Sequence, residues 1–143
     1  FAAGDGDKQA RQASQQFYTA LNSMFAGDVA PMKAVWSHAA DVTYMGPDGS
    51  FDIGWSAVEK NWDKHAAMKL GGKVTPENSK FVTGKDLAVE YTTEKGQNVD
   101  EHGKPMPVSI RATNVYRLEK GTWKMIGHHT DKLPFLDKKA TAK

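Results

Sequence analysis

The chain has 143 residues, 39% hydrophobic and 25% charged, which is typical of one globular domain with a single core. Its 19 basic and 17 acidic residues are mixed along the sequence and leave a formal net charge of +2, so no nucleic-acid-binding surface is predicted. No apolar run is long enough to span a membrane, and the absence of cysteine excludes disulfides, thiolate nucleophiles and thiolate metal sites.

Residues 1–7 are rich in glycine and aspartate and predict a disordered N-terminal segment. The start at Phe1, without an initiator methionine, fits a trimmed secretory signal and fits a cloning boundary equally well. It favours an exported, periplasmic bacterial protein.

Two helices are predicted first. Over residues 8–25 apolar side chains recur every three or four positions, as on one face of an amphipathic helix. Gly27 ends this helix, and Asp28 is the expected N-cap of a second, short helix over residues 29–36. Pro31 is compatible with that helix because it lies in the first turn.

A hairpin and a third helix follow. Residues 41–45 and 50–53 predict short strands around the turn sequence Gly-Pro-Asp-Gly of residues 46–49. Ser56 and Glu59 have the spacing of a capping box, so a helix is predicted from there to about Lys69, where Gly71 and Gly72 stop it.

The second half of the chain predicts four longer strands, over residues 73–83, 87–94, 108–118 and 122–130. The order α-α-β-β-α-β-β-β-β indicates an α+β fold, in which an antiparallel sheet curls over the helices. One domain is expected over residues 8–133, followed by a basic tail over residues 134–143.

The last strand carries the strongest functional pattern. Strict alternation places five residues on one face, namely Trp123, Met125, Gly127, His129 and Asp131. If this face lines a cavity, His129 is a candidate general base and Asp131 can orient it. The alternatives are a partly buried histidine bonded to Asp131 or to a backbone carbonyl, and a solvent-exposed acid at a strand end.

Three local patterns accompany this element order: Phe-Tyr-Thr-Ala-Leu-Asn at 17–22, the Gly49 to Val58 junction, and residues 123–131. Together they resemble the nuclear-transport-factor-2-like superfamily, in particular its SnoaL-like and ketosteroid-isomerase-like members. The chain is also similar to the association domain of calcium/calmodulin-dependent kinases. The letters that match there are Asp100, Gly103, Pro105, Thr113, Val115, Gly121, Trp123 and His129. Both resemblances imply a cone-shaped sheet enclosing a cavity, and a homodimer formed through the sheet.

The resemblance also implies which side chains line the cone. Asn114 matches a position that holds a protonated acid in the isomerase-like enzymes and an arginine in the association domains. By alternation Ala112 and Tyr116 share its face. Tyr44 and Trp55 complete the expected lining.

Several departures from the family pattern argue against known chemistries. The general base of the ketosteroid isomerases falls on Gly46, and their phenolic donor falls on Phe17, with Tyr18 one position away. The pocket arginines of the association domains fall on Asn114 and Glu94. Neither steroid isomerisation by that mechanism nor an anion-binding pocket is expected.

Other aromatic and charged residues are assigned by alternation and periodicity. Trp36, Trp62 and Trp123 are expected in the core, and Arg111 on the outer face of the sheet. Glu90 and Glu94 share one strand face, but the sequence does not decide its direction.

We therefore expect a domain that binds a small apolar or aromatic molecule, with Tyr44, Trp55, Asn114, Tyr116 and His129 as ligand-binding residues. One alternative is an isomerase, dehydratase or cyclase in which His129, with Asp131, transfers a proton. Another is a dimerising module with a vestigial pocket. No cofactor is predicted.

No metal site is predicted either, because His128 and His129 point to opposite faces of a strand. His38 or His65 would have to converge with His129 to build such a site, and their spacing does not indicate this.

Overall fold

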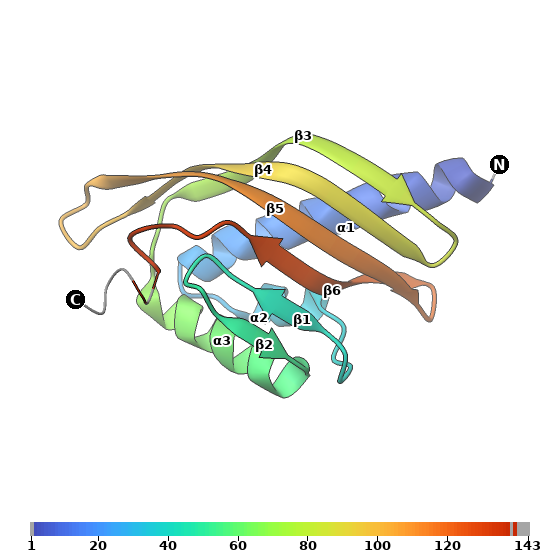
Figure 1. Ribbon diagram of the computed structural model, residues 1–143, viewed down its shortest axis with the longest axis horizontal. Helices are drawn as coiled ribbons and strands as arrows, with labels where there is room; N and C mark the ends of the chain where they lie inside the picture. Colours follow the sequence, from blue (N-terminus) through green and yellow to red (C-terminus); the bar gives the residue numbers. More distant parts are fainter. Residues whose placement is uncertain (1, 138, 140–143) are drawn as a thin grey trace.

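Six strands form one curved sheet in the computed structural model, which describes residues 2–137 and 139 of the chain (Figure 1). The elements follow the expected α+β order. They are α1 (Ala2–Phe25), α2 (Ala30–Val35), β1 (Thr43–Met45), β2 (Phe51–Ile53), α3 (Trp55–Met68), β3 (Lys73–Thr83), β4 (Leu87–Val99), β5 (Pro105–Glu119) and β6 (Thr122–Thr130).

The strands lie in the order β2-β1-β6-β5-β4-β3. All neighbours are antiparallel except β1 and β6, which pair in parallel. The β1–β2 hairpin is therefore paired with the last strand of the chain. In the sequence, α3 and the strands β3, β4 and β5 lie between this hairpin and β6.

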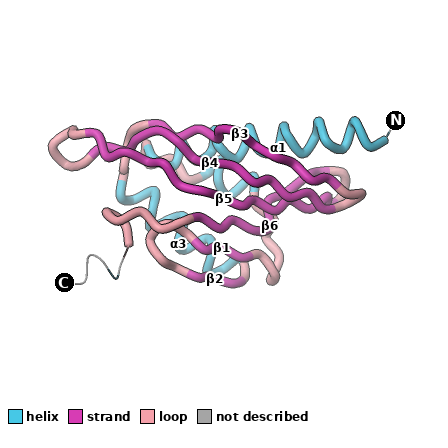
Figure 2. Tube along the Cα trace, turned by 45° about the horizontal axis from the view of Figure 1, so that its top comes forward, coloured by secondary structure: helices cyan, strands magenta, loops and turns pink. Residues whose placement is uncertain are grey.

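The helices of the described chain cover one face of the sheet (Figures 1 and 2). The core lies between them and the sheet, and its largest fully buried side chains include Trp36, Trp62, Tyr44, Tyr116 and Phe17. The prediction that Trp36, Trp62 and Trp123 lie in the core is confirmed. Within the described residues, no helix combines the length and apolar character needed to cross a lipid bilayer.

The first helix begins at Ala2 and not at Lys8, so residues 2–7, expected as a disordered segment, extend α1. Asp7 accepts hydrogen bonds from Arg11 Nε (2.8 Å) and from Thr83 Oγ1 (3.1 Å), which ties the early turns to the end of β3. At the other end, residues 134–137 follow β6 closely. Half of the expected basic tail, residues 138 and 140–143, lies outside the described residues.

Two predicted caps differ from those observed. Helix α3 begins one residue before Ser56, with Gly54 at the N-cap, and no side chain caps it. Helix α2 has Val29 at the N-cap, although Asp28 Oδ1 still accepts a hydrogen bond from the Ala30 N–H (3.2 Å).

Strands β4 and β5 are longer than the sequence predicted. The sequence predicts that β4 ends at Glu94, shortly before Gly96. In the structure Gly96 continues the ladder opposite Val74 and Val108, and a Cβ there would collide with the backbone carbonyl of Lys73. Here close approach of the neighbouring strand, rather than a turn, explains the glycine.

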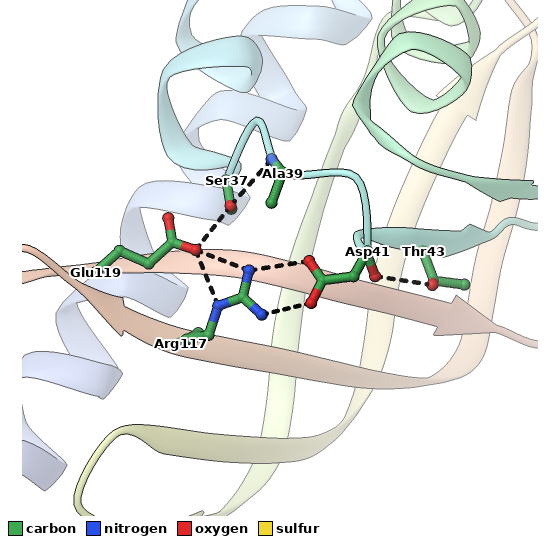
Figure 3. A network of polar contacts seen from close by, with 6 residues as sticks. All are labelled: Ser37, Ala39, Asp41, Thr43, Arg117 and Glu119. Atoms are coloured by element: carbon green, nitrogen blue, oxygen red, sulfur yellow. Dashed lines mark hydrogen bonds and ion pairs between the residues drawn. The ribbon is translucent and has the colours of Figure 1, made fainter.

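An ion-pair cluster fastens the loop between α2 and β1 to β5 (Figure 3). Arg117 donates to both carboxylate oxygens of Asp41 (Nη1–Oδ2 2.7 Å, Nη2–Oδ1 3.0 Å) and from Nε to Glu119 Oε2 (2.9 Å). Ser37 Oγ donates to the same Glu119 oxygen (2.9 Å). We call these four residues the Arg117 clamp.

Candidate functional site

A buried carboxylate anchors the polar centre of the cone. Glu90 on β4 points inward and is fully buried. Within the described part of the chain, four side chains donate hydrogen bonds to it, at 2.7–3.1 Å: Ser14, Ser79, Asn114 and Tyr116. With donors on both oxygens, these hydrogen bonds hold the carboxyl group of Glu90 in one position.

Glu90 fixes the orientation of Asn114. A carboxylate accepts only, so the group that Asn114 turns toward Glu90 Oε1 (3.1 Å) is its amide nitrogen Nδ2. Oδ1 then lies 2.6 Å from His128 Nδ1, which must carry the proton. The other ring nitrogen of His128, Nε2, is therefore a bare acceptor.

Glu94 lies four residues beyond Glu90 on the same face of β4 and is a second buried acid of the site. It is buried, and its Oε2 accepts a hydrogen bond from the hydroxyl of Tyr18 (2.8 Å), which itself accepts from Asn114 Nδ2 (2.9 Å). Burial, opposed by the Tyr18 hydrogen bond and assisted by the charge of Glu90, raises the pKa of Glu94 to about 7.

His128 faces Glu94 across the site, with 3.9 Å between His128 Nε2 and Glu94 Oε2. Burial, together with the nearby His129 and His65, lowers the pKa of His128 to about 3, so the ring is neutral at physiological pH. Its imidazole stacks on Tyr44, with 5.6 Å between the ring centroids, and Phe17 packs against it at 5.0 Å.

Glu94 and His128 form part of the wall of a small cavity of about 40 Å³, which has room for a few waters. The remaining wall is mainly apolar, formed by Leu21, Met24, Phe25, Tyr44, Pro47, Trp62, His65, Leu70, Val74, Asn98, Val108, Ile110, Leu133 and Leu136. Leu133 and Leu136 come from the segment after β6, so the C-terminal part of the chain covers one side of the cavity.

A second polar chain reaches the cavity from α3. Asp48 Oδ2 lies 3.4 Å from His65 Nε2, and His65 Nδ1 lies 3.5 Å from the hydroxyl of Tyr44. Burial disfavours the Asp48 anion, but the hydrogen bonds from His65 and Ser50 hold the pKa of Asp48 below its usual value. All three side chains are buried.

The prediction that His129 faces the interior is wrong. Tyr116 pairs with Met125 and Val115 pairs with Gly127, so Ile126 is an extra residue that forms a β-bulge in β6. Before the bulge Trp123 and Met125 point inward, and after it the buried residues are His128 and Thr130. His129 is exposed on the outer face.

Asp131 also lies outside the site. Its carboxylate accepts hydrogen bonds from Arg111 Nε (2.9 Å) and Nη2 (3.0 Å), on the outer face where Arg111 was expected. Asp131 therefore neither points into the cone nor orients an imidazole there.

The other expected lining residues are only partly brought together. Tyr44 lines the cavity, and Asn114 and Tyr116 point inward as predicted but lie in the hydrogen-bond network behind its wall. Trp55 is half-buried and stacks on His38, with 4.1 Å between ring centroids.

The space beside Gly46 is filled differently from the isomerase pattern. A Cβ at Gly46 would overlap the ring of Tyr44, including its hydroxyl oxygen. The space that the matched general base would need is therefore filled by Tyr44, which explains why only glycine fits here. Tyr18, one position from the expected phenolic donor, nevertheless points inward and bonds to Asn114 and Glu94.

Sequence reasoning missed the residues that make the site, namely Tyr18, Glu90, Glu94 and His128. Two signals were available. A glycine inside a strand, such as Gly127, is typical of a bulge that reverses the faces beyond it. The shared face of Glu90 and Glu94 was recognised, and pairing of Glu90 with the inward Asn114 now fixes its direction. Among the described residues, no three His, Asp or Glu side chains are placed to hold a metal ion.

Comparisons with known proteins agree with this architecture. A family model described as a SnoaL-like domain matches residues 10–131. No curated protein matches the chain.

Solved structures with the same fold include three instructive examples. A proposed calcium/calmodulin-dependent protein kinase type II association domain from Thiobacillus denitrificans has 25% identity and a TM-score of 0.72, over 86% of this chain and 94% of that one. A proposed NTF2-like dehydratase from Streptomyces avermitilis has 21% identity and a TM-score of 0.78, over 90% and 97%. A proposed ketosteroid isomerase from Shewanella frigidimarina has 19% identity and a TM-score of 0.66, over 84% and 92%.

Proposed function

Because the chain belongs to the family of SnoaL-like domains, we propose that it binds a small, mainly apolar molecule in the cavity between the helices and the inner face of the sheet. The observation that carries this proposal is the placement of two polar side chains, Glu94 and the neutral His128, in a mainly apolar wall. Such a wall is typical of small-molecule sites, where few polar groups orient an apolar ligand. His129, Asp131 and Trp55 have no part in it.

Phenol is a suitable probe, because its ring is apolar like the wall and its hydroxyl can donate to His128 Nε2. Its ring exceeds the cavity volume of about 40 Å³, so its binding requires the wall to move outward. We expect phenol to shift the backbone NMR signals of Glu94, His128 and Trp62 in a saturable way. Leu70→Trp, at the cavity wall, should abolish these shifts, whereas Leu87→Trp, on the exposed face of β4, should leave them unchanged. Shifts confined to the outer face, or none, would reject the binding site.

A second candidate function is proton transfer on a bound carbonyl compound. It is favoured by Glu94, whose pKa of about 7 leaves acid and base forms both populated at neutral pH. The carboxylate would remove a proton from the carbon beside a carbonyl, and the resulting carboxylic acid would return one elsewhere. Dehydratase and isomerase are names that proteins of the same fold carry.

Hydrogen–deuterium exchange at the α-carbons of cyclohexanone tests this chemistry directly. Exchange in heavy water should be faster with the protein than in buffer, should rise as the pH passes about 7, and should be lost in Glu94→Gln. His129→Asn is the matched control and should exchange like the wild type. Exchange rates equal to those in buffer would reject proton transfer and leave ligand binding as the remaining candidate function.

We also propose that two copies associate through the outer face of the sheet. This face carries the exposed apolar side chains Val82, Leu87 and Tyr91, which neighbouring strands place together. Light scattering after size exclusion should give a dimer mass, and Tyr91→Glu should shift it toward the monomer. A monomer at millimolar concentration would reject the dimer, while leaving the cavity proposals untouched.

A further inference from the structure

We infer that the cavity selects a protonated amine on a small apolar body and rejects carboxylates and phosphates. The inference rests on the proposed binding function, because it names the ligand class of the same site. It follows from the hydrogen-bonding groups that remain free there and from the charges around them.

The donors beside Glu94 are already used within the protein. The Tyr18 hydroxyl donates to Glu94 Oε2 (2.8 Å), and the Nδ1–H of His128 donates to Asn114 Oδ1 (2.6 Å). Asn114 divides its amide protons between Tyr18 (2.9 Å) and Glu90 (3.1 Å). None of these protons is available to a ligand.

The polar contacts of Asp48, His65 and Tyr44 use their donors in the same way. Because Asp48 is held as an anion, the His65 nitrogen that faces it, Nε2, carries a proton. The other ring nitrogen, Nδ1, lies 3.5 Å from the Tyr44 hydroxyl, so this hydroxyl is also paired within the protein.

The polar corner of the cavity, formed by Glu94 and His128, has only hydrogen-bond acceptors free. His128 Nε2 accepts no hydrogen bond from the described residues, and Glu94 Oε1 is likewise free of a described donor. Two donors of the wall are not fully used. The indole nitrogen of Trp62 is buried without a partner among the described residues, and Asn98 Nδ2 donates one of its two protons to the Gly71 carbonyl (2.9 Å). A ligand that donates hydrogen bonds therefore matches this corner better than one that accepts them.

The charges around the cavity point the same way. Glu90 lies behind the wall, Glu94 lies in it, and Asp48 lies next to His65. Among the described residues that line the cavity, none is lysine or arginine. An anion would enter a site with two or three acids and no compensating cation, which is costly at low dielectric, whereas an ammonium group would pair with Glu94.

The aromatic wall supports the same ligand class. The rings of Tyr44 and Trp62 pack edge to face at 4.9 Å between centroids, beside the imidazole of His128. Aromatic faces attract cations, most strongly when the cation is removed from water. The apolar side chains of the wall, such as Leu21 and Ile110, would contact the hydrocarbon body.

The pairing has a definite pH dependence. Glu94 is surrounded by Glu90 on β4, Tyr18 on α1, His128 on β6, Tyr44 on β1 and, farther out, the His65–Asp48 pair. Only an ionised Glu94 pairs with ammonium, so amine affinity should rise as the pH increases through about 7. A neutral ligand of the same shape should show no such rise.

Three probes of one shape and different charge test the inference: isobutylamine, isobutanol and isobutyrate. We expect NMR titration of the wild-type protein at pH 8 to show isobutylamine binding at least tenfold more tightly than isobutanol, and isobutyrate not binding. Between pH 6 and pH 8 the affinity for isobutylamine should increase severalfold, and that for isobutanol should stay constant.

Glu94→Gln separates charge from shape. It keeps an acceptor for Tyr18 and should bring the affinity for isobutylamine to within about threefold of that for isobutanol, with the pH dependence lost. Glu101→Gln, in the exposed turn between β4 and β5, is the matched control and should bind both probes like the wild type.

The outcomes distinguish this inference from the function on which it rests. If isobutanol and phenol bind in the cavity but isobutylamine binds no more tightly than isobutanol, the amine preference is wrong and the binding function stands. If isobutyrate binds most tightly, the inference is overturned outright. If none of the probes binds, both fail. The comparison of the three probes on the wild-type protein needs no variant, so it tests the inference even if Glu94→Gln misfolds.

Discussion

Burial shifts the pKa values of Glu94 and His128 in opposite directions, and each shift favours the neutral form. Their effects on stability are therefore opposite in sign. Glu94 binds a proton more tightly in the folded state than in the unfolded chain, and His128 binds one less tightly. Between pH 4.5 and 6.5 the two contributions oppose one another, so single variants are needed to reveal them.

Glu94→Gln should remove a loss of stability that grows with pH. The folded-state pKa of Glu94, about 7, exceeds its ordinary value of 4.5, so the wild type loses stability as the pH rises through this window. Relative to the wild type, the variant should gain up to about 3 kcal/mol between pH 4.5 and pH 7.5. Urea unfolding at several pH values measures this, and parallel curves for the two proteins would contradict it.

His128→Asn should act in the opposite direction. The unfolded chain protonates His128 near pH 6.5, and the folded protein only near pH 3, so stability falls as the pH is lowered through this window. Between pH 7 and pH 3 the free energy of unfolding of the variant should fall by on the order of 4 kcal/mol less than that of the wild type. His129→Asn, its exposed neighbour, should follow the wild-type curve; if it behaves like His128→Asn, the assignment of faces is wrong.

Individual residues show how far sequence reasoning reaches. Asn114, Tyr116 and Tyr44 were expected to face inward and do so, because simple alternation holds along β5 and β1. Alternation fails at β6 because one extra residue changes the face. The tautomer of His128 was beyond prediction, since Glu90 sets it through Asn114 from two other strands.

At the scale of elements, the Arg117 clamp explains how an irregular loop is held against the sheet. Residues 36–42 connect α2 to β1, and their backbone hydrogen bonds outside regular elements join them to Met125 of β6 and to Gly54 and Trp55 at the start of α3. The fork of Arg117 matches the carboxylate of Asp41 with two parallel hydrogen bonds, a geometry that lysine cannot reproduce (Figure 3).

Arg117→Met should loosen this loop while keeping the apolar contacts of the side chain. We expect a loss of about 1 kcal/mol in the free energy of unfolding and faster amide hydrogen exchange over residues 37–42. Arg111→Met removes an ion pair on the outer face that joins two adjacent strands, and should change neither the loop exchange nor the stability by a comparable amount. Unchanged exchange in Arg117→Met would show that the clamp does not hold the loop.

The sequence predicted the type and order of all the elements, and the bounds of β3 and β6 to the residue. It ended β4 at Glu94 instead of Val99 and began β5 at Val108 instead of Pro105, because local propensity around Gly96 says nothing of the close strand beside it. It placed the start of α1 too late, because the contact of Asp7 with Thr83 spans 76 residues. Local patterns identify elements, and long-range contacts set their lengths.

At the scale of the whole molecule, the chain covers its own cavity at the end. After β6 the backbone N–H of Leu133 donates to the carbonyl of Pro47 in the β1–β2 turn (3.0 Å), which brings Leu133 and Leu136 over the cavity. Leu133 belongs to the core and Leu136 packs against it, so a ligand that entered on this side would have to displace these contacts.

Leu133→Ala should enlarge the cavity and weaken its cover. Leu133 is buried, so we expect a loss of about 2–4 kcal/mol in unfolding free energy, together with tighter or faster binding of phenol. Leu87→Ala, at an exposed leucine, should cost much less and leave phenol binding unchanged. A loss of stability without any change in phenol exchange would assign Leu133 to the core alone.

The extra residue in β6 also affects how homologues should be compared. A column of an alignment assumes that matched letters project the same way, and Ile126 breaks this assumption for the rest of the strand. In a relative whose last strand is regular, the letter opposite His129 projects into the cone. Transferring a role by letter would thus choose the wrong imidazole, and superposed backbones are the sound basis for naming equivalent positions.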